Sequence, residues 1–126
     1  MKQKSILISR ALLGLIFFVF GLNGFLQFLP MPPLPEKAAA FMAALADAGY
    51  LFPLIKGVEV VGGLLLLTHL WTPLALILLA PIVVNIFFFH LVLEPAGLPI
   101  GILLVLLEIF LAWSYRERFA PLLKMK

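Results

Sequence analysis

A run of apolar residues at 51–70, long enough to cross a bilayer, carries a lysine and a glutamate within it. About 20 helical residues span the roughly 30 Å hydrocarbon core of a membrane, and each charge near its centre costs about 3 kcal/mol on insertion scales. Lys56 and Glu59 are three positions apart, so a helix places them on one face, where they can pair with each other or with neighbouring helices. This helix face therefore either stabilises the fold through an ion pair or forms part of a functional site.

The composition of the whole chain is typical of an integral membrane protein. Hydrophobic residues make up 64% of the chain and charged residues 12%, about half the charged fraction of soluble domains. We therefore expect one all-α domain, 1–126, folded as a bundle of four transmembrane helices. The spans are expected at about residues 6–29, 51–70, 73–93 and 98–113.

Several classes of chemistry are disfavoured by residue types that are missing or misplaced. The chain has no cysteine, which excludes thiol–disulfide exchange and thiolate-held iron–sulfur clusters, so any redox role needs a bound cofactor or a partner. His69 and His90 are expected at opposite membrane faces, which disfavours bis-histidine haem ligation. No metal site and no covalent cofactor are predicted, and no basic patch with interleaved aromatics indicates nucleic-acid binding.

The segment between the first two spans starts with a proline cluster that should stop the first helix. A short helix is expected at about residues 35–47, with one apolar side and with Gly49 available as a C-cap. Such a helix would lie at the membrane interface. Its length of about 20 Å is enough to roof a small bundle, although a loosely attached surface helix is the alternative.

The basic residues predict the orientation of the bundle in the membrane. Most of them lie at the N-terminal end of the first span or after the C-terminal end of the last span, at Lys2, Lys4, Arg10, Arg116, Arg118, Lys124 and Lys126. The opposite side has Lys37 together with acidic residues. By the positive-inside rule both termini should be cytoplasmic, with Arg10 extending to the near surface as a packing-face residue.

Counting about 1.5 Å of rise per residue places most of the polar residues of the spans at a similar depth, about 8–15 Å below the outer surface. The expected ligand pocket consists of Asn23, Lys56, Glu59, Asn85, His90 and Glu108. Because Lys56 is the only cation of this layer, we expect it to hold both Glu59 and Glu108. The structural alternative is a buried ion-pair network that fixes helix register. No catalytic residue is identified.

Four stretches of the chain resemble the DoxX family of small four-helix membrane proteins. They are RALLGLIFFVFGLNGFLQFLPMPPLP at 10–35, GYLFPLIKGVEVVGGLLLL at 49–67, PIVVN at 81–85 and LAWSYRERFAPLL at 111–123. The resemblance implies a multi-pass protein of the bacterial or archaeal cytoplasmic (inner) membrane. It also implies an association with thiosulfate:quinone oxidoreduction or with oxidative-stress complexes that include soluble redox partners.

The leading functional interpretation is a non-catalytic or cofactor-dependent subunit of an oxidoreductase system, which binds a lipophilic small molecule such as quinone and supports a membrane-associated redox complex. Its expected partners are the lipid bilayer, redox proteins and other copies of the chain. Two alternatives stay open at this point. One is a small proton-linked transporter, and the other is a membrane scaffold or assembly factor whose polar residues serve helix packing.

Overall fold

The computed structural model describes residues 2–28 and 33–124. These residues form helices and no strand, in the order α1 (Lys2–Leu26), α2 (Glu36–Asp47), α3 (Leu51–Thr68), α4 (Thr72–Phe88), the π-helix η1 (Phe89–Leu93), the 3₁₀-helix η2 (Pro95–Gly97), α5 (Leu98–Ser114), α6 (Arg116–Phe119) and the 3₁₀-helix η3 (Ala120–Leu123). The predicted all-α class, with a short helix between the first two spans, is confirmed.

Four helical stretches of the described chain are long and apolar enough to cross a membrane: Lys2–Leu26, Leu51–Thr68, Thr72–Leu93 and Pro95–Ser114. Each agrees with a predicted span to within a few residues. The first helix begins earlier than predicted and ends at Leu26, and position 29 of that prediction lies outside the described residues. The helical turns after Tyr115 were not predicted.

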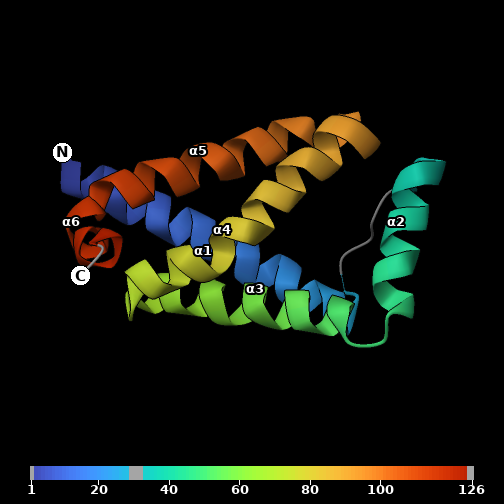
Figure 1. Cartoon of the computed structure of the whole chain (residues 1–126), viewed down its shortest axis with the longest axis horizontal. Helices are drawn as coiled ribbons and strands as arrows, with labels where there is room; N and C mark the ends of the chain where they lie inside the picture. Colours follow the sequence, from blue (N-terminus) through green and yellow to red (C-terminus); the bar gives the residue numbers. More distant parts are fainter. Residues whose placement is uncertain (1, 29–32, 125–126) are drawn as a thin grey trace.

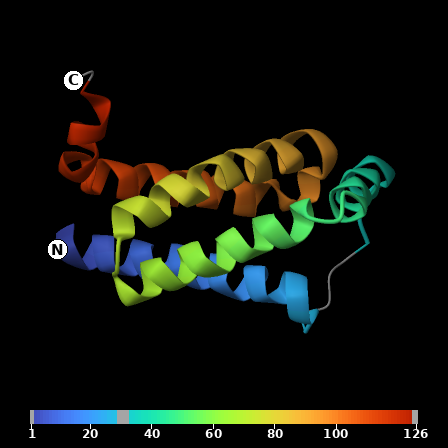
Figure 2. The ribbon, with the colours of Figure 1, turned by 60° about the horizontal axis from the view of Figure 1, so that its bottom comes forward.

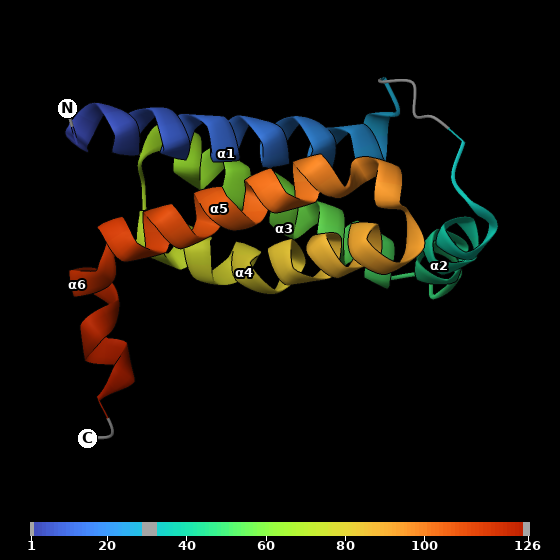
Figure 3. The same ribbon diagram turned by 90° about the horizontal axis from the view of Figure 1, so that it is seen from above.

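The four long helices lie side by side along the length of the molecule, and both termini lie at one end (Figure 1). We call this the terminal end. α2 crosses the opposite end of the bundle, which we call the α2 end, and the two other views show the same arrangement (Figures 2 and 3). The helices therefore define two distinct ends at which polar groups can gather.

α2 is attached to the bundle through apolar side chains. Ala38 is fully buried, and the ring of Phe41 lies 5.7 Å from the ring of Phe89 in η1. α2 also contacts α3. These contacts favour a roof over the bundle rather than a loosely attached surface helix.

The closest helix packing is between α1 and α3, and glycines make it possible. A Cβ added to Gly63 would lie 2.5 Å from the backbone nitrogen of Phe18 and 2.7 Å from the carbonyl oxygen of Gly14. A Cβ on Gly21 would lie 2.9 Å from the backbone nitrogen of Val60. The small residues Gly14, Gly21 and Gly63 therefore allow backbone-to-backbone approach, as is common in membrane helix pairs, and we call them the glycine seam.

Arg10 lies inside this packing, which corrects the prediction that it extends to the near surface. Its side chain is buried, with 7% of the residue exposed, and its guanidinium donates a hydrogen bond to the backbone carbonyl of Leu66 in α3. A guanidinium cannot lose its charge in a protein, so a carbonyl acceptor is needed to offset its burial. Arg10 therefore ties the N-terminal half of α1 to α3.

Candidate functional site

Lys56 and Glu59 form an ion pair on α3, with Nζ and Oε1 3.3 Å apart. The two partners are buried unequally, since 19% of the lysine side chain is exposed but only 5% of the glutamate side chain. Glu59 is therefore the more deeply buried partner. The pairing offsets part of the cost of placing two charges in a membrane helix.

The aliphatic stem of Lys56 rests on α1 at a glycine. A Cβ added to Gly24 would lie 2.5 Å from Cγ and 2.6 Å from Cδ of Lys56, so a larger residue would displace the stem. The ammonium group also lies 5.7 Å from the centre of the Phe52 ring, one turn earlier on α3. Gly24 of α1 and the Phe52 ring of α3 therefore hold the Lys56 side chain in place.

A cavity of about 440 Å³ opens beside this lysine at the α2 end. Its lining residues come from α1, the end of α1, α2 and α3, and they are Phe20, Asn23, Gly24, Gln27, Met42, Phe52 and Lys56. The volume is within the range of about 300–1,000 Å³ that is typical of small-molecule sites. We call it the α2-end cavity.

The lining of the α2-end cavity combines apolar surfaces with a few polar groups. Phe20, Phe52 and Met42 supply aromatic rings and a thioether, whereas Asn23, Gln27 and Lys56 supply amide and ammonium donors. The ammonium has three N–H donors, and the contact with Glu59 uses one of them. An apolar pocket with a small set of donors suits a lipophilic molecule with a hydrogen-bond-accepting head.

Three of the six predicted pocket residues gather at this place. Asn23 and Lys56 line the cavity, and Glu59 is paired with Lys56 at its edge. Asn85 does not join them, because it is exposed on the outer surface of α4. The predicted polar layer is therefore divided between the interior and the outside of the bundle.

Glu108 lies apart from the ion pair, on α5. The residue is half-buried, and its Oε1 atom is buried without a hydrogen-bond partner among the residues that the structure describes. The prediction that Lys56 holds both glutamates is therefore wrong, since its only carboxylate partner within the described chain is Glu59. Glu59 lies on α3 beside Lys56, and Glu108 lies on α5.

His90 belongs to a separate polar cluster at the α2 end. Its Nδ1 lies 2.9 Å from Oε2 of Glu94 and 3.2 Å from the carbonyl oxygen of Glu94. Both residues are placed by η1, in which Glu94 donates its backbone N–H to the carbonyl of Phe89 at 3.0 Å, five residues earlier. A Cβ on Gly97 would lie 2.6 Å from Oε2 of Glu94, so this glycine makes room for the cluster. His90 does not line the α2-end cavity.

Sequence reasoning missed the apolar part of the cavity lining and also Gln27. Phe20, Gly24 and Gln27 recur at spacings of four and three, and Phe52 and Lys56 are four apart. These spacings place each set on one helix face. The signal was present, but the same spacing is found on every packed helix face and does not distinguish a cavity from a core.

Comparison with known proteins supports the family resemblance. The family model described as DoxX matches residues 5–91, which is more than half of the 126-residue chain. No curated protein and no solved structure matches the chain. With four apolar helices capable of crossing a membrane among its described residues, the protein is a multi-pass integral membrane protein, and it belongs to the DoxX family.

Proposed function

We propose that the α2-end cavity binds a lipophilic small molecule with a hydrogen-bond-accepting head, such as a quinone, and that the protein thereby supports a membrane-associated redox complex as a non-catalytic subunit. The observation that carries this proposal is the position of Lys56, which faces an aromatic cavity while its charge is balanced by Glu59. A balanced pair can donate hydrogen bonds without demanding a charged ligand.

The donors of the cavity match a quinone head. A quinone carbonyl accepts hydrogen bonds and donates none, and Lys56, Asn23 and Gln27 all carry N–H groups. Phe20 and Phe52 provide surfaces on which a flat ring can pack. When bound, a quinone supplies two-electron, two-proton redox chemistry, whereas these residues of the chain bind and orient its head.

Met42 offers a way to test the cavity without touching the ion pair. It lines the cavity from α2, so Met42→Trp should fill part of the volume. Ala40 lies on the same helix, is exposed and does not line the cavity, so Ala40→Trp is the matched control. Binding of a short-chain benzoquinone to purified protein in neutral detergent would be measured by calorimetry.

We expect saturable binding to the wild type and to Ala40→Trp, and binding weakened about tenfold or more in Met42→Trp, because the added ring occupies the place of the ligand. Gln27→Leu, which removes one donor at an exposed position, should weaken binding about fivefold. Absence of saturable binding, or equal weakening by both tryptophans, would exclude this cavity as the quinone site.

A further inference from the structure

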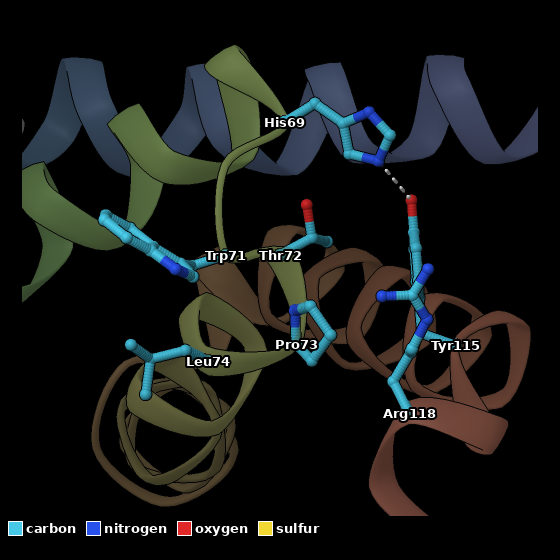
Figure 4. A pocket seen from close by; sticks show the side chains of 7 residues that line it. All are labelled: His69, Trp71, Thr72, Pro73, Leu74, Tyr115 and Arg118. Carbon is cyan, nitrogen blue, oxygen red and sulfur yellow. Dashed lines mark hydrogen bonds between the residues drawn. The ribbon is translucent and has the colours of Figure 1, made fainter.

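A second cavity, of about 550 Å³, lies at the terminal end, between the turn that joins α3 to α4 and the segment with Tyr115, directly after α5, and Arg118 in α6 (Figure 4). Its polar lining residues are His69, Thr72, Tyr115 and Arg118, with Trp71 at its side. We call it the terminal-end cavity. It shares no lining residue with the α2-end cavity.

The turn between α3 and α4 builds one wall of the terminal-end cavity. His69 and Trp71 adopt left-handed backbone conformations, with φ of 60° and 48°, although neither is a glycine. They reverse the chain so that Thr72 begins α4 directly at the cavity. Non-glycine residues in this conformation carry a conformational cost that the surrounding contacts must offset. One such contact is between Nε2 of His69 and the hydroxyl of Tyr115, 3.3 Å apart.

Thr72 is the residue that points to a ligand. Only 3% of it is exposed, and its Oγ1 has no hydrogen-bond partner within the described chain. Figure 4 shows this oxygen pointing toward the side of the cavity on which His69 lies. A buried hydroxyl without a partner is unfavourable, so an acceptor that reached this oxygen would stabilise the site.

The charges around the cavity favour an anionic acceptor. Arg118 lines the cavity and is exposed, and it takes part in neither of the two ion pairs found within residues 2–28 and 33–124. No acidic side chain is among the lining residues. At the start of α4, Thr72 and Leu74 carry backbone N–H groups while Pro73 carries none, and this end of the helix has the positive end of the dipole. The neighbouring Arg116 is engaged elsewhere, since its guanidinium lies over the Trp113 ring and donates to the Trp113 carbonyl.

We propose that the terminal-end cavity binds a phosphate group, carried either by an anionic phospholipid or by a soluble phosphate ester. Arg118 supplies the positive charge, the Thr72 hydroxyl donates a hydrogen bond, and the start of α4 adds the backbone N–H groups of Thr72 and Leu74. When Nε2 of His69 donates to the Tyr115 oxygen, the phenol hydrogen is also available to the phosphate. This is a site separate from the proposed quinone cavity.

Two phosphate-bearing probes test this proposal on delipidated protein in neutral detergent. They are dihexanoyl-phosphatidylglycerol, measured below its micelle concentration, and glycerol 3-phosphate. Calorimetry should show saturable binding of at least one probe. Arg118→Gln should weaken that binding about tenfold or more, because a charge-assisted hydrogen bond is lost, whereas Arg116→Gln should leave it unchanged.

Thr72→Val provides a readout that a purely structural role would not give. The variant should bind the probe about fivefold more weakly, while the ligand-free protein becomes as stable as the wild type or more stable, because the buried hydroxyl has no partner to lose. Binding of phosphatidylglycerol alone assigns a lipid headgroup, and binding of both probes assigns a soluble phosphate ester. Binding of neither probe, or equal weakening by Arg116→Gln and Arg118→Gln, would overturn the proposal. So would a loss of stability in ligand-free Thr72→Val.

Discussion

The two cavities of this DoxX protein each have one lysine or arginine in their lining, but only one of these cations is paired. Lys56 has the Glu59 carboxylate at 3.3 Å, whereas Arg118 has no carboxylate partner in the part of the chain that the structure describes. A paired cation can donate hydrogen bonds to a neutral head, while an unpaired cation attracts an anion. The ligand class that we propose for each cavity therefore depends on whether its cation has a carboxylate partner.

A second contrast separates the two glutamates of the spans. Glu59 is held by Lys56, and Glu108 has one carboxylate oxygen buried with no partner among residues 2–28 and 33–124. The comparison therefore makes different predictions for residues that look alike in the sequence.

Lys56→Met should lower the free energy of unfolding by about 3 kcal/mol, because it leaves the buried Glu59 carboxylate without a cation. Glu59→Gln should cost only about 1 kcal/mol, since Lys56 is more exposed than its partner and can remain solvated or contact the cavity. Both would be measured by unfolding in mixed detergent micelles.

The double variant Lys56→Met and Glu59→Met is the control for this pair. Because apolar residues can replace a buried ion pair at little cost, it should recover most of the stability lost in Lys56→Met. Equal losses of stability in the two single variants, or no recovery in the double variant, would show that Lys56 and Glu59 do not contribute to stability as one ion pair.

Gly63→Ala should lower the free energy of unfolding by about 2 kcal/mol, because its Cβ would meet backbone atoms of Phe18 and Gly14 that cannot move aside. Gly57→Ala is the matched control on the same helix, where a Cβ would have no described atom within 4 Å. Alanine is the better helix former, so this control should be neutral or slightly more stable. Similar losses at both positions would contradict the glycine seam.

Glu108→Leu should raise the free energy of unfolding by about 1 kcal/mol, because it removes a buried acceptor without a described partner. Glu59→Leu should instead lower it, since Lys56 loses its carboxylate. The pair of leucine variants would be compared in the same micelle assay. A loss at Glu108 as large as the loss at Glu59 would mean that Glu108 has a stabilising partner after all.

The sequence was sufficient to predict the four helices and the short α2, because hydropathy and length determine which segments can span a membrane. It was also sufficient to predict that Lys56 and Glu59 share a helix face. The position of Asn85 was not predicted by this reasoning. Counting residues gives the depth of a side chain along a helix, but the rotation of the helix about its axis is set by packing, and Asn85 is rotated outward.

The terminal-end cavity could not be predicted for a related reason. It depends on left-handed conformations at His69 and Trp71, and neither residue type favours that conformation as a glycine would. It also depends on α5 ending where Tyr115 can reach His69 across the bundle. Contacts between residues so distant in the sequence leave no local pattern.

The central claim, that the pairing of each cation decides the ligand class, can be tested in one experiment. Binding of a neutral short-chain benzoquinone and of dihexanoyl-phosphatidylglycerol would be measured for the wild type, Met42→Trp and Arg118→Gln. We predict that Met42→Trp loses the quinone and keeps the lipid, whereas Arg118→Gln loses the lipid and keeps the quinone. Loss of both ligands in either variant, or of neither in both, would contradict the account.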